Sequence, residues 1–257
     1  GGPQTYNTNM LRRFFKLLYG TYAALALLAV LLPLCLLIIL GPTLALRRAI
    51  GRAGVKLAMW VIGQPLRISG LEHLPPGPCI CVPNHASYID GLILTAALPA
   101  RFTFLVQHGA ASWPLVGKTI SRMGVSFVNR GSTREAAQAA HELLRRIGEG
   151  ESFTIFAEGT FKRPPGLLSF HSGAFVIASK AGVPVAPAVI RGSRQLFGEG
   201  MRLPGWSQVS ITVLPAIAPA GEGRDTANTL RDAVRAAILA RCGEPDAAHP
   251  LPEPHKD

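Results

Sequence analysis

The sequence predicts an α/β fold, a largely parallel sheet flanked by helices, preceded by an N-terminal apolar membrane-associated helix pair. Short apolar runs typical of strands recur from Leu66 onward, and segments of helical length separate many of them. Strands that alternate with helices favour a parallel sheet. The helix pair is predicted by a third observation: residues 17–46 carry no charged side chain.

Composition divides the chain into four parts. Residues 1–9 look like a remnant of cloning ahead of a natural start at Met10. Residues 10–66 form the membrane-associated helical segment, and residues 67–242 form the α/β domain. Residues 243–257 hold four prolines and are expected to be a disordered tail.

The uncharged segment predicts contact with a bilayer. As one straight helix it would be about 45 Å long, more than the roughly 30 Å of a hydrocarbon core. Pro33 and Gly41-Pro42 interrupt it, and proline kinks or breaks helices. We expect a hairpin or bent helix pair that dips into one leaflet with Pro33 deepest. A single span, a buried helix of a soluble protein and a signal peptide are the alternatives.

The elements of the domain follow from the pattern in chain order. A basic, apolar helix over 50–62 is expected to lie at the membrane interface. The strands are predicted at 79–82, 102–106, 125–128, 153–156, 185–190 and 209–214. The helices are predicted at 89–98, 115–123, 133–147, 170–181 and 226–241, the last with an apolar stripe.

The charge distribution favours a membrane partner over nucleic acid. The net charge is +11, and residues 1–71 carry eight basic residues and no acidic one. The excess positive charge therefore flanks the most apolar segment, as it does in proteins that bind anionic lipid. Basic residues at both ends of that segment favour the cytoplasmic face of a membrane, the inner membrane in a bacterium. No nucleic-acid motif is found.

The stretch "NHASYID", residues 84–90, follows one predicted strand and opens a helix. Ligands of open α/β sheets gather beyond the carboxyl ends of strands, so His85 lies where chemistry is expected. A carboxylate at Asp90, about one helical turn on, can fix the histidine tautomer and leave the other ring nitrogen as a base. The alternative is structural: Ser87 and Asp90 also fit a helix capping box.

Two further polar stretches end predicted strands. "FAEGTFKRPPGLLSF", residues 156–170, holds Glu158, Gly159 and Thr160 before two cations, and it fits either an anion-binding turn or a solvated loop. "GVSFVNRGS" ends a strand with Arg130, whose guanidinium matches phosphate with two parallel hydrogen bonds. A lone surface arginine is the alternative there.

Four motifs occur in order at residues 84–90, 124–130, 156–160 and 183–187: Asn-His-x-x-x-x-Asp, Gly-x-x-x-x-x-Arg, Phe-x-Glu-Gly-Thr and Val-Pro-Val-x-Pro. Together they resemble the glycerolipid acyltransferases of the lysophosphatidate acyltransferase (PlsC-like) superfamily, over about residues 71–191. The resemblance implies His85 as base and Asp90 as its orienting partner. It also implies Arg130 as a phosphate ligand, and it places Glu158, Gly159 and Thr160 in the acceptor site.

The resemblance implies a membrane-bound enzyme that moves an acyl group to a lysophospholipid hydroxyl. The donor is acyl-CoA or acyl-carrier protein, and the acceptor is most simply 1-acyl-glycerol 3-phosphate, giving phosphatidic acid. The sequence departs from the common pattern at Ala157, at residues 107–110 and at Phe161, where an arginine is frequent. These departures leave another lysolipid acceptor open.

No nucleophile elbow, phosphate-binding Gly-rich loop, metal-ligand spacing or cofactor motif is found in the sequence. We therefore expect direct transfer with no cofactor and no metal. A lysophospholipase or thioesterase that uses the same base, and an inactive membrane adaptor, are the rival functions.

Overall fold

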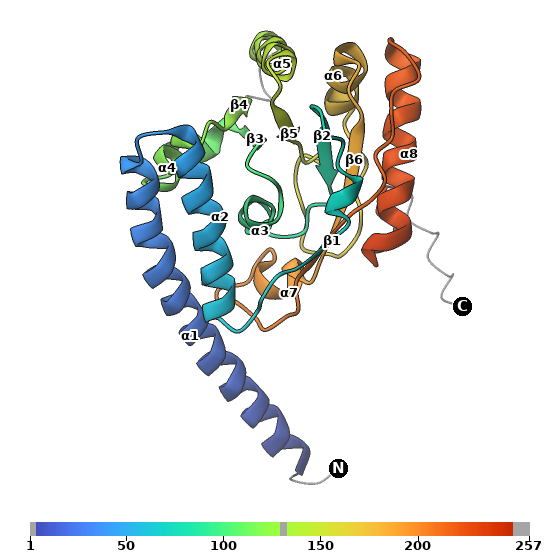
Figure 1. Cartoon of the computed structure of the whole chain (residues 1–257). Helices are drawn as coiled ribbons and strands as arrows, with labels where there is room; N and C mark the ends of the chain where they lie inside the picture. The colour runs from blue at the N-terminus through green and yellow to red at the C-terminus, as the bar shows by residue number, and fades with distance from the viewer. Residues whose placement is uncertain (1–3, 129–132, 249–257) are drawn as a thin grey trace, which may run out of the picture.

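The computed structural model describes residues 4–128 and 133–248 (Figure 1). Two long helices, α1 (Gln4–Leu40) and α2 (Leu44–Val61), precede the sheet. The strands are β1 (Arg67–Ser69), β2 (Ile80–Pro83), β3 (Phe102–Gln107), β4 (Ser126–Val128), β5 (Ser152–Thr154), β6 (Val185–Arg191) and β7 (Ser210–Val213). The helices among them are η1 (Leu71–His73), α3 (Asp90–Ala97), η2 (His108–Ser112), α4 (Val116–Arg122), α5 (Thr133–Gly148), α6 (Gly173–Ala181), α7 (Ser193–Phe197) and α8 (Arg224–Cys242).

The predicted α/β class is confirmed. The seven strands form one sheet in the order β1-β7-β6-β2-β5-β3-β4. Every neighbouring pair is parallel except β6 and β7, which are antiparallel. The strands β1 and β7 at one side therefore make the sheet mixed, and β2 lies near its centre with β6 and β5 as neighbours.

Helices cover both faces of the sheet and create two hydrophobic cores. One core joins α1, α2 and α3 to one face, where Cys79 and Cys81 lie with the fully buried Ile93. The other joins α5, α6 and α8 to the opposite face, where Ile80 and Val82 lie. Alternate residues of β2 therefore enter different cores, as the period of two in a strand requires. Both faces are buried, so the strand is apolar throughout.

The expected break at Pro33 is wrong. Helix α1 runs through Pro33 without interruption and ends at Leu40, and the turn lies at residues 41–43. Thr43 caps α2 by accepting a hydrogen bond from Leu46 N at 3.2 Å. Proline removes one backbone hydrogen bond, and here packing offsets that loss: Leu34 sits against the bare backbone of Gly54 in α2.

Arginines of α2 bind backbone carbonyls of the protein. Arg47 Nε donates to Gly41 O at 2.7 Å, next to the end of α1. Arg48 is buried and donates to Met123 O at 3.1 Å and to Ala100 O at 3.0 Å. Arg48 is one of the basic residues that flank the apolar segment, but its guanidinium holds α2 onto the α/β domain and does not face a membrane surface.

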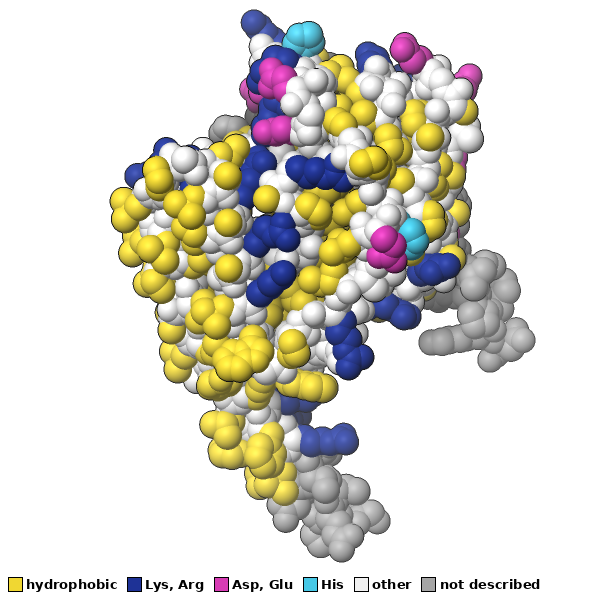
Figure 2. All heavy atoms as spheres, viewed as in Figure 1, with side chains coloured by type: hydrophobic (Ala, Val, Ile, Leu, Met, Phe, Trp, Pro, Cys, Tyr) yellow, Lys and Arg dark blue, Asp and Glu magenta, His cyan; other side chains and the backbone are white. Residues whose placement is uncertain are grey.

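The outer face of α1 is apolar and exposed. Residues 10–40 form a helix long enough and apolar enough to cross a membrane, by length and composition only. Figure 2 shows hydrophobic side chains gathered over this face of the molecule. Exposed leucines and phenylalanines recur along the helix, among them Phe14, Leu25 and Leu36. An apolar surface of this extent marks a contact with a membrane or a partner.

The chain after α8 is ordered as far as residue 248, so the expectation of a disordered tail is wrong for residues 243–248. Asp246 forms a β-bridge with Leu167 and an ion pair with Arg235 at 2.5 Å. Residues 249–257 lie outside the described part of the chain. The first residues of the supposed tail therefore belong to the α/β domain.

Candidate active site

The loop that follows β2 lies at the carboxyl end of the sheet, near its centre. Asn84, directly after β2, is buried and pairs with the backbone of β6: Nδ2 donates to Ile190 O at 3.0 Å, and Oδ1 accepts from Ile190 N at 2.7 Å. The asparagine side chain thus continues the sheet pairing where the backbone of β2 turns away. This fixes the start of the loop that carries His85.

His85 and Asp90 form a hydrogen-bonded pair. His85 Nδ1 lies 2.9 Å from Asp90 Oδ2, and Asp90 is fully buried at the first position of α3. Because a carboxylate only accepts, the proton lies on Nδ1 and Nε2 is the basic nitrogen. Nε2 has no hydrogen-bond partner within the described residues. The side chain of His85 is 19% exposed, so this nitrogen can meet a substrate.

Only half of the predicted capping box is present: Asp90 reaches back to Ser87 N, but Ser87 Oγ donates to Phe197 O, and the N-cap of α3 is Ile89 without a side-chain cap. Asp90 Oδ2 also accepts from Ala86 N at 2.7 Å and from Ser87 N at 2.9 Å. One carboxylate oxygen therefore gathers three N–H groups, two from the loop backbone and one from the imidazole. The arrangement stabilises the negative charge of Asp90 and sets the orientation of the ring in one step.

Aromatic rings enclose the imidazole. Phe156 stacks on His85 with a centroid distance of 4.2 Å, and Phe161 meets the ring edge-on at 4.6 Å. Tyr88 packs edge-on against Phe161 at 4.8 Å and lies 6.0 Å from Phe197 of α7. The base therefore sits in an apolar collar in which water competes poorly for the bound hydroxyl.

Glu158 is a buried carboxylate beside the loop that carries His85. It is 3% exposed, its Oε1 accepts from His85 N at 2.6 Å, and its Oε2 accepts from Leu168 N at 2.8 Å. Burial raises the pKa of Glu158 to about 7, although the two N–H bonds oppose the rise. The structure thus places this residue against the backbone of His85.

The other predicted site residues lie near the collar or outside the described residues. Gly159 has φ +76°, a conformation that glycine adopts readily, and it turns the chain after Glu158. Thr160 is exposed, and its hydroxyl lies 3.4 Å from Phe161 O. Arg130 lies outside the described residues, between β4 and α5, and β4 is three strands from β2. The structure therefore brings together His85, Asp90, Glu158 and Gly159.

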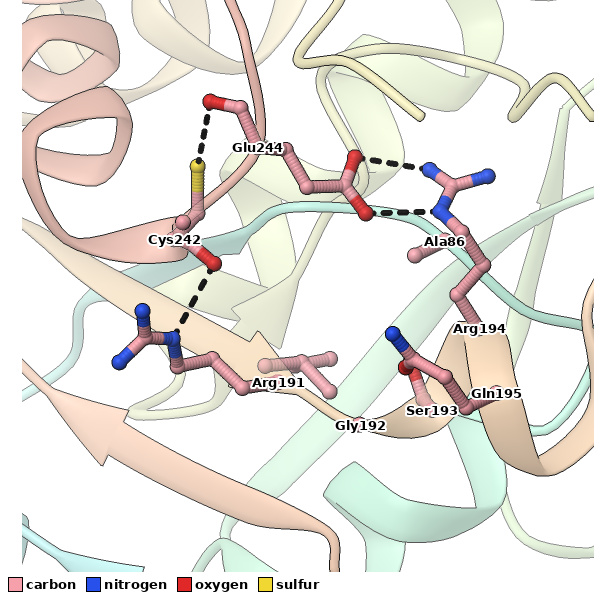
Figure 3. Close-up of a pocket in the computed structure, with 10 residues that line it drawn as sticks. Ala86, Arg191, Gly192, Ser193, Arg194, Gln195, Cys242 and Glu244 are labelled. Atoms are coloured by element: carbon pink, nitrogen blue, oxygen red, sulfur yellow. Dashed lines mark hydrogen bonds and ion pairs between the residues drawn. The ribbon is translucent and has the colours of Figure 1, made fainter. Parts of the chain in front are cut away.

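The ion pair between Arg194 and Glu244 supports the loop after Glu158. Figure 3 shows Arg194 and Glu244 facing each other beside a cavity of about 230 Å³ that Ala86 also lines. Arg194 Nε lies 2.7 Å from Glu244 Oε1, and Arg194 Nη1 donates to Lys162 O at 2.6 Å. Glu244 Oε2 in turn accepts from Gly166 N at 2.8 Å. Residues 162–166 are therefore held from α7 and from the chain after α8.

The sequence missed three parts of this site. It gave no sign of α7, which is only five residues long, nor that Phe197 packs on Tyr88. It did not indicate that Glu158 would bind the backbone of His85, 73 residues away. The described residues contain no group of three or more His, Cys, Asp or Glu side chains arranged to hold a metal ion.

Comparisons with known proteins show the family of this chain. A profile of the family described as Acyltransferase matches residues 65–191. The 1-acyl-sn-glycerol-3-phosphate acyltransferase of Borreliella burgdorferi is 31% identical over 167 residues, 65% of this chain and 67% of that protein. The chain belongs to the acyltransferase family.

A second relative and a solved structure match over different shares of their length. A chloroplastic 1-acyl-sn-glycerol-3-phosphate acyltransferase of Brassica napus is 33% identical over 135 residues, 52% of this chain and 39% of that protein. The crystal structure of the 1-acyl-sn-glycerophosphate acyltransferase PlsC from Thermotoga maritima superposes with a TM-score of 0.71. That match is 21% identical and covers 89% of this chain and 97% of the other, so it shows a shared fold.

Proposed function

We propose that this acyltransferase moves a fatty acyl group from a thioester donor to the free hydroxyl of a lysophospholipid. The proposed acceptor is 1-acyl-glycerol 3-phosphate, because relatives that match the chain carry that substrate in their names. The observation that carries the proposal is the His85–Asp90 pair at the central strand end, with Nε2 directed away from the carboxylate. The donor is acyl-CoA or acyl-carrier protein.

The geometry supports direct transfer with His85 as general base. Nε2 takes the acceptor's hydroxyl proton while the oxygen attacks the thioester carbonyl. The C–O bond forms, the C–S bond breaks, and the imidazolium returns its proton to the departing thiolate. Asp90 stabilises the imidazolium that forms between these steps. General-base help of this kind contributes roughly 10²–10⁴-fold, and the placement of two substrates contributes much of the rest.

Membrane association at the cytoplasmic face is part of the proposal. The apolar outer face of α1 and the basic residues at its start support it, since both favour an anionic membrane surface. The acceptor is a membrane lipid, so an enzyme held at the bilayer meets it without extracting it into water. The donors expected here are made in the cytoplasm.

Arg130 remains the proposed ligand of the acceptor's phosphate. Loss of a hydrogen bond to a charged group is worth about 1.5–3 kcal/mol. Arg130→Ala should therefore raise the KM for lysophosphatidate at least tenfold and leave the KM for the acyl donor unchanged. An equal rise in the KM values of acceptor and donor would show that Arg130 does not bind the acceptor's phosphate.

The experiment that tests the function is a two-substrate assay with purified protein. Radiolabelled acyl donor is supplied with and without lysophosphatidate, and the lipid product is separated from free fatty acid. We expect label in phosphatidic acid, and release of thiol only when the acceptor is present. Label in free fatty acid without an acceptor would identify a thioesterase, and label in another diacyl lipid would identify a different acceptor.

A further inference from the structure

An apolar groove of about 910 Å³ lies between residues 15–19 of α1 on one side and Gln195 of α7 with residues 201–206 on the other. From α1 its walls include Phe15, Leu17 and Tyr19, and from the other side Met201, Pro204 and Trp206. The catalytic pair does not line it. A concave apolar space of this size is larger than the voids inside a packed protein, and it has the dimensions of a ligand site.

The groove is a built feature, because a buried glutamine holds its two walls at a fixed separation. Gln64 is 2% exposed and donates both to the hydroxyl of Tyr19 on α1 and to Gly205 O, the latter at 3.0 Å. Its Oε1 accepts from Ser207 N at 3.2 Å. The Tyr19 hydroxyl also donates to Ile62 O at 3.0 Å. These bonds join α1, the end of α2 and the segment after α7.

One end of the groove is closed by close approach of the two walls. A Cβ on Gly20 would lie 2.9 Å from Leu203 Cβ and 3.1 Å from Pro204 O. The helix therefore touches the opposite wall through the bare backbone of Gly20. At the open side, Phe15 and Trp206 are both largely exposed. The groove thus opens where the apolar face of α1 begins.

A continuous line of contacts joins the groove to His85. Met201 lines the groove, and its sulfur accepts a hydrogen bond from Gly198 N at 3.2 Å. Phe197, the preceding residue, accepts a hydrogen bond from Ser87 Oγ at 2.6 Å through its backbone O. Phe197 also packs on Tyr88 of the aromatic collar. The contacts place the groove beside the collar, on the side where α1 lies.

The charges at the groove define the chemistry of its occupant. Lys16 and Arg202 line it together with the apolar side chains, and no acidic residue lines it. The two cations favour an anionic lipid over a neutral one at the groove, and the apolar walls accept its chain. A lysophospholipid with a phosphate headgroup has both properties. A neutral lipid lacks the charge, a nucleotide lacks the chain, and a free fatty acid lacks the hydroxyl that would reach His85.

We infer that this groove holds the acyl chain of the lysophospholipid acceptor while its hydroxyl reaches His85. The inference rests on the proposed acyl transfer. It adds where the acceptor's acyl chain binds and which residues limit the length of that chain. The acyl donor then approaches the collar from another side. The chain enters from the apolar face of α1, so the acceptor can pass from the bilayer to the base without crossing water.

The test fills the groove and varies the acceptor. Leu17→Trp adds volume in the groove, and Leu18→Trp is the matched control: both leucines are exposed on α1, and only Leu17 lines the groove. Each protein is assayed with oleoyl and with hexanoyl lysophosphatidate, and separately with long-chain and short-chain acyl donors. Thermal unfolding of each variant in detergent confirms that it is folded.

Leu17→Trp should lower kcat/KM for the oleoyl acceptor about tenfold, or about 1.4 kcal/mol, and leave the hexanoyl acceptor within twofold of the unaltered protein. Leu18→Trp should leave both unchanged. A loss that follows the length of the donor chain, an equal loss for both acceptors, or no loss would each overturn the inference. Failure of the proposed function is seen separately, as an unaltered protein that transfers to neither acceptor.

Discussion

At the scale of single residues, the site depends on buried carboxylates that organise backbone N–H groups. Asp90 gathers the backbone at Ala86 and Ser87 together with the imidazole of His85. Glu158 binds the backbone N–H of His85 from the opposite side. His85 is thereby fixed through its ring and through its main chain, by two acids from different segments of the chain.

The first residue-scale prediction concerns Asp90. Asp90→Asn removes the charge that stabilises the imidazolium and the fixed tautomer, so kcat should fall about 10²–10⁴-fold. Steady-state kinetics with saturating donor and acceptor measures it. Asp225→Asn is the control, since Asp225 lies exposed in the first turn of α8. Near-full turnover in a folded Asp90→Asn protein would reduce Asp90 to a helix cap.

The second residue-scale prediction concerns the pH dependence of stability at Glu158. Burial raises its pKa to about 7, above the value of about 4.5 expected in the unfolded chain. Folding therefore favours the protonated form, and the stability from this group is fully present below pH 4.5 and is lost as pH rises through 7. Relative to Glu158→Gln, the unaltered protein should lose up to about 3 kcal/mol of unfolding free energy between pH 5 and 8.

Chemical unfolding of both proteins at the two pH values measures that difference, with exposed Glu199→Gln as the control. If the difference in unfolding free energy between the unaltered protein and Glu158→Gln is the same at both pH values, burial does not raise the pKa of Glu158. The kinetics of the same variant separate two roles of Glu158. A lower kcat with an unchanged KM for the acceptor identifies a residue that positions His85, and a raised KM identifies the acceptor site that the family motif implies.

At the scale of elements, α1 and α2 pack through small residues. A Cβ on Gly54 would meet Leu34 Cδ1 at 2.2 Å, and a Cβ on Gly51 would meet Met123 Cε at 2.8 Å. The two glycines let α2 lie close to α1 on one side and to α4 on the other. This close approach compensates for the proline inside α1, and it explains why the helix does not break at Pro33.

Gly54→Leu should therefore destabilise the protein by about 1–3 kcal/mol through overpacking. Thermal unfolding in detergent measures the effect. Gly173→Leu, at the start of α6 where no atom lies within 4 Å of the added Cβ, is the control and should change stability little. Equal stability of Gly54→Leu and the unaltered protein would mean that α1 does not pack on α2 in solution.

Helices and strands could be predicted from the sequence where local sequence patterns determine them. The apolar runs predicted six strands close to their observed bounds, because burial on both faces leaves a continuous apolar signal. The edge strand β1 was missed: it has only three residues, of which Arg67 and Ser69 are exposed. The sequence offered two possible breaks in the apolar segment, one at Pro33 and one at Gly41-Pro42. Packing of α1 on α2 keeps the helix intact at Pro33, so the turn follows at Gly41.

The same distinction applies to the site. His85 and Asp90 are five residues apart, so their pairing could be predicted from spacing within one turn of chain. The contact of Glu158 with His85 N joins residues far apart in sequence, and only the pairing of β2 with β5 brings them together. The collar that Phe197 and Tyr88 share depends in the same way on α7, which no pattern in the sequence indicated.

At the scale of the whole molecule, the C-terminal half of α1 is attached to the rest of the protein. Tyr19 and Tyr22 donate to Ile62 O and Val61 O at the end of α2, and Arg122 Nε donates to Ile39 O near the end of α1. These bonds would be lost if α1 crossed a bilayer alone while the domain stayed in water. We therefore propose that the molecule presents the exposed face of α1 to one leaflet and keeps the site beside it.

This arrangement predicts that both ends of the helix pair are accessible from one side. Single cysteines at Arg12 and Lys56, in a background without Cys35, Cys79, Cys81 and Cys242, should both react with an impermeant reagent at the cytoplasmic face of sealed vesicles. Lys56 is exposed on α2 and is chosen as the second position for this reason. Arg47 and Arg48 are not used, because both bind backbone carbonyls inside the protein. Reaction at Arg12→Cys from the opposite face alone would establish a transmembrane span.

The central claim is that His85 transfers an acyl group directly to a lysolipid hydroxyl. The most direct measurement is a single-turnover reaction of labelled acyl donor with lysophosphatidate, run with the unaltered protein and with His85→Ala. The account predicts labelled phosphatidic acid without label on the protein, and a loss of about 10²–10⁴-fold in rate for His85→Ala. Label trapped on the protein, or an undiminished rate in the variant, would contradict it.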